Sequence, residues 1–211
     1  QIGLALAQRR AVGRLPAARG ASPNVLVLLV DALRADHLSA YGYARPTSPN
    51  LDRIARQGTL LENAFAASSR TLPSHAALLM GRYPFPHSVE AIRADRRPTL
   101  AEALGARGYR TAAFSANTFF FTRRVGLDRG FLRFEDYALS PGGIAGRMLY
   151  GRAFGWLLGK LGLEDVPWSR RAGDINRSLL RWVERDRNKP FFAFLNYFEV
   201  HNWFVPPPEW R

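Results

Sequence analysis

The sequence contains no cysteine, and only two of its 30 basic residues are lysines, Lys160 and Lys189. The absence of cysteine excludes a disulfide framework, a thiolate zinc site and a cysteine nucleophile. It leaves the redox compartment undetermined, because no thiol is present to be oxidised. No internal apolar run reaches the roughly 18 to 20 residues that cross a bilayer. The interior of the chain is therefore not expected to span a membrane.

Acidic residues are also scarce: the chain has 17 of them and 30 basic residues, which gives a formal net charge of +13. A strongly basic chain suggests nucleic-acid binding as one function class. The arginines are dispersed, however, and no stretch alternates them with stacking aromatics. We therefore expect affinity for an anionic substrate or a membrane surface, and no specific nucleic-acid partner.

With 211 residues, of which 47% are hydrophobic, the chain can form one α/β domain or a large piece of a bigger one. Residues 1–22 open with apolar residues and continue with Arg, Pro and Gly. Two interpretations stay open: a basic linker, or the remnant of a preceding transmembrane or signal segment. The second would place the intact protein at a membrane or in the cell envelope. The sequence indicates no oligomeric state.

Apolar runs and helical periodicity alternate along the chain, which predicts a mostly parallel central sheet with helices on both faces. The first run, residues 24–30, is typical of a strand buried on both faces. Further strands are predicted at 59–68, 109–114 and within 189–204, and helices at 45–58, 99–108 and 172–186. Residues 117–170 are expected to be irregular except for one helix near 147–162, either a packing helix or a membrane-surface helix.

Three polar residues fall where predicted elements meet: Asp31 ends the first strand, Thr71 precedes an apolar helix, and His201 follows the last strand. Ligands gather at the carboxyl ends of parallel strands, so these side chains are expected at one edge. A hydroxyl at a helix start faces free N–H donors, but it needs a metal or a base to act as a nucleophile. Asp31 could hold a divalent cation that activates Thr71. Alternatively Thr71 is only a helix cap and His201 a surface histidine.

Four stretches in this order resemble the sulfatase family of the alkaline-phosphatase superfamily: "PNVLVLLVDALRADHLSAYGY", "PTSPNLDRIARQGTLLENAFA", "TLPSHAALLMGRYP" and "KPFFAFLNYFEVHNWFVPP". The resemblance covers about residues 23–208 and implies an alkaline-phosphatase/sulfatase-like fold, incomplete at its C-terminus. Residues 23–211 would form the N-terminal portion of the catalytic domain. It further implies that Asp31 binds metal, that Thr71 is the nucleophile and also a metal ligand, and that His201 contacts substrate.

Several positions depart from the family pattern. Ala32 replaces a second Asp ligand, and His75 replaces the Arg of the nucleophile motif, where it could bind substrate or metal or only pack. Asn117 lies near the position of a family lysine and is expected to contact substrate. Arg34 would bind the anion or orient the metal loop, or be a surface residue. A threonine would oxidise to a ketone, so the formylglycine route of sulfatases is not expected for Thr71.

A direct threonine nucleophile also resembles the phosphoethanolamine and phosphoglycerol transferases. The resemblance therefore implies a metal-dependent hydrolase of sulfate or phosphate esters that uses one or more divalent cations, calcium or else zinc or manganese. The alternatives are a membrane-associated phospho-alcohol transferase and an inactive fragment with a sulfatase fold. Because the family draws further metal ligands from a later strand, the isolated 211-residue piece is expected to be inactive.

Overall fold

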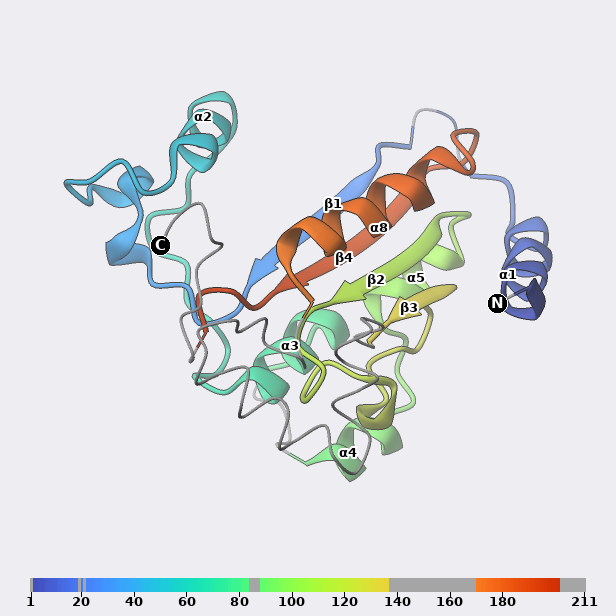
Figure 1. The fold of residues 1–211 in the computed structure, drawn as a ribbon. Coiled ribbons are helices and arrows are strands. Elements are labelled where there is room, and N and C mark those ends of the chain that lie inside the picture. Colours follow the sequence, from blue (N-terminus) through green and yellow to red (C-terminus); the bar gives the residue numbers. More distant parts are fainter. Residues whose placement is uncertain (1, 19, 21, 84–87, 137–169, 202–211) are drawn as a thin grey trace, which may run out of the picture.

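The computed structural model describes residues 2–18, 20, 22–83, 88–136 and 170–201, and its centre is a parallel β-sheet (Figure 1). The strands are β1 (Val25–Val30), β2 (Arg110–Ser115), β3 (Arg133–Glu135) and β4 (Phe191–Tyr197), in the spatial order β1-β4-β2-β3. Each pair is parallel, with Val30 beside Tyr197 and Ser115 beside Asn196. The carboxyl ends of three strands therefore meet at one edge, as predicted.

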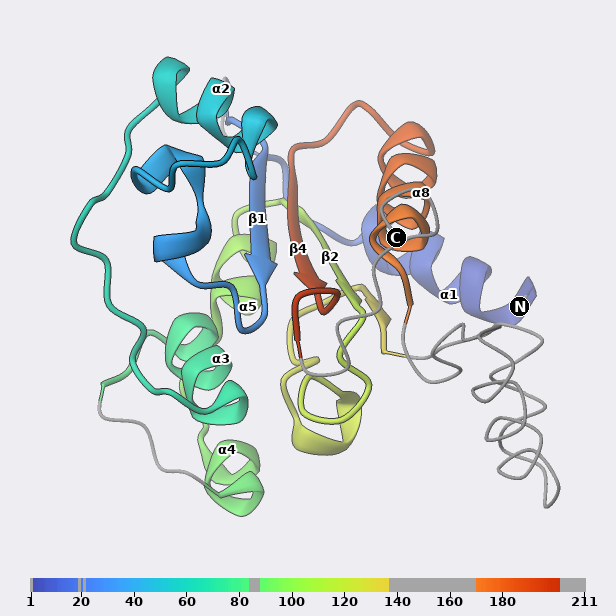
Figure 2. The same ribbon diagram turned by 60° about the vertical axis from the view of Figure 1, so that its left-hand side comes forward.

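Helices cover both faces of this sheet (Figure 2). Alternate residues of the central strands point to opposite faces, because the side-chain period of a strand is two. Phe192 and Phe194 pack in a core with α3 and α5, whereas Ala193 and Leu195 pack in a second core beneath α8. The helices of this three-layer arrangement are α3 (Thr71–Met80), α4 (Val89–Ala94), α5 (Leu100–Gly105) and α8 (Ala172–Glu184). The predicted α/β class is confirmed.

Helix α8 forms where the sequence predicts an amphipathic helix. Ile175 and Trp182 are buried on its inner side, and Leu179 and Val183 pack beside them. The Trp182 ring meets Phe114 of β2 edge-on at a centroid distance of 6.2 Å. This apolar stripe fixes α8 over β2 and β4.

Strand β1 differs from the prediction that it is buried on both faces. Val25, Val27 and Leu29 pack against the core of α3 and α5. Leu26 and Leu28, which point to the opposite face, are 46% and 49% exposed. The reason is that β1 is the edge strand, and α8 packs over β4 and β2 rather than over β1.

The predicted strand at 59–68 is wrong. This segment is irregular, and Leu61 and Phe65 are 64% and 90% exposed. A short apolar run has little intrinsic preference for the extended state unless a neighbouring strand pairs with it. The helix before it is confirmed as α2 (Pro49–Gln57) and ends at Gly58. The predicted helix near 147–162 lies outside the described residues.

The N-terminal segment begins with α1 (Ile2–Gly13), and residues 14–18 that follow it are irregular. This stretch passes so close to Gly108 that a Cβ atom there would lie 2.6 Å from the carbonyl oxygen of Pro16. Gly108 also has a φ of +86°, so only glycine fits this position without strain. In the part of the chain that the structure describes, no helix has both the length and the apolar character needed to cross a bilayer. The residues that the structure describes also form three short 3-10 helices, Ala35–His37, Ser39–Tyr41 and Arg123–Val125.

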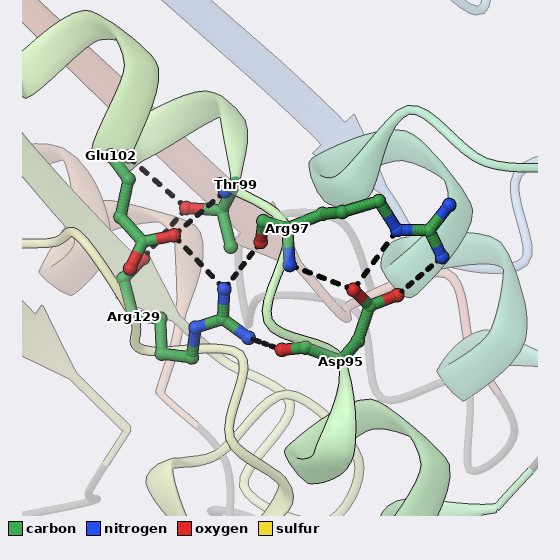
Figure 3. A network of polar contacts seen from close by, with 5 residues as sticks. All are labelled: Asp95, Arg97, Thr99, Glu102 and Arg129. Atoms are coloured by element: carbon green, nitrogen blue, oxygen red, sulfur yellow. Dashed lines mark hydrogen bonds and ion pairs between the residues drawn. The ribbon is translucent and has the colours of Figure 1, made fainter.

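A polar network holds the start of α5 (Figure 3). Thr99 and Glu102 form a reciprocal capping box, in which each side chain accepts a hydrogen bond from the backbone N–H of the other residue. Arg129 donates to Glu102 at 3.0 Å and to the carbonyl oxygens of Asp95 and Arg97, and the Arg97 guanidinium pairs with the Asp95 carboxylate at 2.9 Å. The network ties the α4–α5 connection to the loop between β2 and β3.

Candidate active site at the carboxyl edge of the sheet

Asp31 is the first residue beyond β1 and is almost buried, at 9% exposure. Its N–H donates to the carbonyl oxygen of Tyr197 at 2.9 Å, so the β1–β4 ladder continues to this residue. Ala32 then adopts a φ of +61°, and it is the one non-glycine residue with a positive φ in the described ranges. This conformation costs an alanine about 1 kcal/mol. Backbone strain of this kind clusters at functional sites, and here it adjoins the predicted metal ligand.

Thr71 opens α3, and its hydroxyl faces the Asp31 carboxylate. Thr71 Oγ1 lies 3.4 Å from Oδ1 and 3.5 Å from Oδ2 of Asp31. Both distances exceed the usual O–H···O range of about 2.5–3.0 Å, so the hydroxyl is close to the carboxylate without being tightly bound to it. The helix-cap alternative is not what the structure shows, because the N-cap residue of α3 is Arg70. The proximity predicted from the element ends is confirmed for this pair.

Asn117 follows β2, is fully buried, and holds the Asp31 carboxylate in place. Its Nδ2 donates to Asp31 Oδ2 at 3.0 Å, while its Oδ1 accepts the N–H groups of Phe119 and Phe120 at 3.1 and 2.9 Å. Backbone N–H groups can only donate, so these two bonds assign Oδ1 and leave the amide nitrogen for Asp31. Substrate contact by Asn117 stays a prediction, whereas its contact with Asp31 is direct.

His75 lies one turn after Thr71 in α3 and is 2% exposed. Its Nδ1 is 2.8 Å from the carbonyl oxygen of Thr71, and its Nε2 is 3.1 Å from Asn196 Nδ2. Burial lowers the pKa of His75 and outweighs the hydrogen bond to Thr71 and the charge of Asp31, which raise it. The buried imidazole therefore contacts β4 through Nε2, while Nδ1 bonds within α3 to Thr71. Substrate or metal contact by His75 stays a prediction.

Two further predicted residues stand outside this cluster. The Arg34 side chain is exposed and pairs with Asp36, with nitrogen–oxygen distances of 3.0 and 2.5 Å. The His201 ring stacks on Phe198 at a centroid distance of 4.1 Å. Within the described ranges neither side chain hydrogen-bonds to Asp31 or Thr71. The roles of Arg34 and His201 in binding substrate stay predictions.

Sequence reasoning missed Asn196, which lies at the centre of the contacts beneath the site. It is fully buried near the end of β4, and its Oδ1 accepts the N–H of Asn117 at 3.2 Å. The Ser115 hydroxyl lies 3.5 Å from this Oδ1 and donates to the carbonyl oxygen of Asn117 at 2.9 Å. The available signal is a single amide within the apolar run "FFAFLNYF". A polar side chain in a strand buried on both faces requires hydrogen-bond partners, and those partners were not identified from the sequence.

The oxygens of Asp31 and Thr71 are of the type that hard divalent cations accept. The residues that the structure describes contain no group of three or more His, Cys, Asp or Glu side chains that could hold a metal ion. Asp31 and Thr71 therefore fit a divalent cation as part of a coordination sphere, which needs donors beyond this pair.

The sulfatase family model matches residues 23–210. Human arylsulfatase H is 37% identical over 108 residues, which are 44% of this chain and 19% of that protein. An N-acetylgalactosamine-6-O-sulfatase from Bacteroides thetaiotaomicron is 35% identical over 97 residues, 42% of this chain and 19% of the relative. The matched segments thus span about a fifth of the length of these relatives.

Solved structures share the fold at low sequence identity. A phosphonate monoester hydrolase from Agrobacterium radiobacter superposes with a TM-score of 0.61 at 22% identity, over 89% of this chain and 43% of that one. An alkaline phosphatase superfamily protein from Vibrio parahaemolyticus gives a TM-score of 0.62 at 18% identity, over 97% and 50% of the two chains. Since the family model covers nearly all of the sheet, its helices and the Asp31–Thr71 edge, the chain belongs to the sulfatase family.

Proposed function

We propose that the intact protein cleaves sulfate or phosphate esters with Thr71 as the nucleophile, beside a divalent cation held in part by Asp31. The observation that carries the proposal is the placement of the Thr71 hydroxyl 3.4 and 3.5 Å from the two Asp31 oxygens. This pair lies at the carboxyl edge of a parallel sheet, where α/β proteins bind their ligands. The chain's sulfatase-family membership and net charge of +13 support an anionic ester as the substrate class.

The residues of this site have separate tasks in the proposed reaction. The Asn117 amide fixes the Asp31 carboxylate by donating to its Oδ2, and it makes no bond to Oδ1 of Asp31. A divalent cation, when bound, would lower the pKa of the Thr71 hydroxyl and offset negative charge on the ester. The hydroxyl releases its proton to solvent, and its oxygen forms a bond to sulfur or phosphorus while the bond to the alcohol oxygen breaks. That oxygen keeps the bonding electrons and leaves as the alcohol after taking up a proton.

A second step returns the enzyme to its starting state. Water attacks the sulfur or phosphorus of the threonyl ester, the bond to the Thr71 oxygen breaks, and the hydroxyl regains a proton. Thr71 lies in the first turn of a ten-residue helix. Helix starts carry partial positive charge, which would stabilise the negative oxygens of the anion in both steps.

Turnover by the intact protein tests this proposal with aryl sulfate, phosphate monoester and phosphodiester substrates. Thr71→Ala should lower kcat by at least about 1,000-fold, because the nucleophile is lost. Thr71→Ser replaces the secondary hydroxyl with a primary one at the same position and should keep measurable turnover. Thr59→Ala serves as the matched control, because it removes the hydroxyl of an exposed threonine outside the Asp31–Thr71 site. It should leave kcat unchanged.

Two results would contradict the proposal. Retained turnover in Thr71→Ala would remove Thr71 from the chemistry. Full turnover after exhaustive chelation would remove the cation from the mechanism, because no activity would be left for added calcium, zinc or manganese to restore. Transfer of the acid group to an added alcohol in place of water would instead identify a transferase.

A further inference from the structure

Asn196 occupies an unusual position for an amide side chain. It is 0% exposed in a strand whose other inward-facing residues are apolar, and it contacts groups from three other positions in the chain. These are the N–H of Asn117, the hydroxyl of Ser115 and Nε2 of His75. A buried amide of this kind is retained only where its donors and acceptors are matched.

The contacts determine which way the amide faces. The backbone N–H of Asn117 can only donate, so the atom 3.2 Å from it must be the acceptor Oδ1. The nitrogen Nδ2 therefore faces His75 Nε2 at 3.1 Å. Since an amide nitrogen can only donate, Nε2 of His75 must be the acceptor and carries no proton.

The same constraint assigns the histidine tautomer. A neutral imidazole without a proton at Nε2 carries it at Nδ1. Nδ1–H then donates to the carbonyl oxygen of Thr71 at 2.8 Å. A continuous chain of hydrogen bonds thus runs from the backbone of Asn117 through Asn196 and His75 to the backbone of Thr71.

The two ends of this chain carry the two sides of the candidate site. At one end, Asn117 also donates its Nδ2 to the Asp31 carboxylate. At the other end, the tethered residue Thr71 carries the hydroxyl that faces this carboxylate. Residues 75 and 196 are 121 positions apart in sequence, so this link exists only in the folded sheet.

We propose that Asn196, acting through the Nδ1–H tautomer of His75, is a positioning residue that sets the separation between the Thr71 hydroxyl and the Asp31 carboxylate. This role rests on the proposed function, because it matters for rate only if Thr71 is the nucleophile. Small displacements of a reacting group lower rates strongly, by up to about 100-fold for 1 Å. A residue that only fills the core would affect stability without a specific effect on kcat.

The test uses Asn196→Asp in the intact protein, because the substitution keeps the shape and the acceptor for Asn117 but removes the donor to His75. The His75 ring nitrogens are followed by NMR with ¹⁵N-labelled histidine, assigned by the loss of signals in His75→Gln. The wild type should show a proton on Nδ1 and none on Nε2. In Asn196→Asp, Nε2 faces a carboxylate and should gain a proton, which restores the hydrogen bond with its direction reversed. The kinetic arm is therefore His75→Gln, which removes the ring donor to Thr71 and should lower kcat by about 10- to 100-fold with KM nearly unchanged.

Thr111→Val is the control for a purely structural effect. Thr111 is as buried as Asn196 and lies near the opposite end of β2. The substitution removes its hydrogen bonds to the carbonyl oxygen of Gly130 and the N–H of Leu132. It should lose stability while kcat and the His75 signals stay as in the wild type. If Asn196→Asp does not fold, the ring-nitrogen signals of the wild type and the kcat of His75→Gln still test the link to Thr71.

A wild-type His75 protonated at Nε2 would overturn the proposal, as would an unchanged kcat in His75→Gln. An equal loss of kcat in Thr111→Val would also overturn it, because the effect would then follow stability. A wild-type protein without turnover of any ester would overturn the proposed function instead. The ring-nitrogen signals would still show whether the link to Thr71 is formed.

Discussion

Asn117→Asp tests the geometry of the site most directly, because it changes one atom of the Asn117–Asp31 contact. The amide nitrogen 3.0 Å from Asp31 Oδ2 becomes a carboxylate oxygen. The other oxygen still accepts the N–H groups of Phe119 and Phe120, so the turn after β2 keeps its hydrogen bonds. Asn117→Ala would lose both features and could not separate them.

The structure sets the size of the expected effect. Two unit charges about 3 Å apart repel by about 5 kcal/mol at an effective dielectric constant of about 20. The pair can avoid this by taking up one proton, as closely spaced carboxylates do. From an ordinary aspartate pKa of about 3.9, proton uptake at neutral pH costs about 4 kcal/mol. The free energy of unfolding should therefore fall by about 4 kcal/mol.

Urea denaturation of the intact protein at neutral pH measures this loss, first in chelator and then with calcium, zinc or manganese. The loss should shrink when a divalent cation is added, because a cation between the two carboxylates offsets their repulsion. Asn63→Asp adds the same charge at an exposed loop position and should change stability little. Equal stability of Asn117→Asp and the wild type in chelator would refute the contact with Asp31. A loss that no cation reduces would refute Asp31 as part of a cation site.

Two further predictions concern the backbone at the site and the network in Figure 3. Ala32→Gly should change the free energy of unfolding by less than about 1 kcal/mol. Ala32→Val should lower it by about 2 kcal/mol, because a branched Cβ fits poorly at a φ of +61°. Equal thermal stability of the two variants would contradict the left-handed conformation. Burial raises the pKa of Glu102, but hydrogen bonds from Arg129 and Thr99 prevail and lower it. This stabilisation is present above the unfolded-state pKa of about 4.3 and is lost as pH falls through the lower folded-state value. Glu102→Gln should therefore flatten the acid limb of stability against pH, measured by denaturant titration, whereas Glu62→Gln at an exposed position should leave it as in the wild type.

Much of the fold was predictable because its elements carry strong local signals. The run before Asp31, the helix ending at Gly58 and the stripe of Ile175 and Trp182 each have one clear period. The segment 59–68 has a similar apolar content, yet it forms no strand because no neighbour pairs with it. Exposure of Leu26 and Leu28 was likewise unpredictable, since it depends on where α8 lies rather than on the strand's own residues.

The amino-acid sequence by itself determined that an α/β sheet forms and that Asp31 and Thr71 stand at the ends of elements, because periodicity and turn residues act over a few positions. The tertiary structure alone decided the distance at which these two side chains meet, that Asn117 fixes the carboxylate, and that Asn196 joins His75 beneath them. The physical reason is that buried polar groups must find partners wherever the fold brings them, and those partners lie 40 to 121 positions away in the chain.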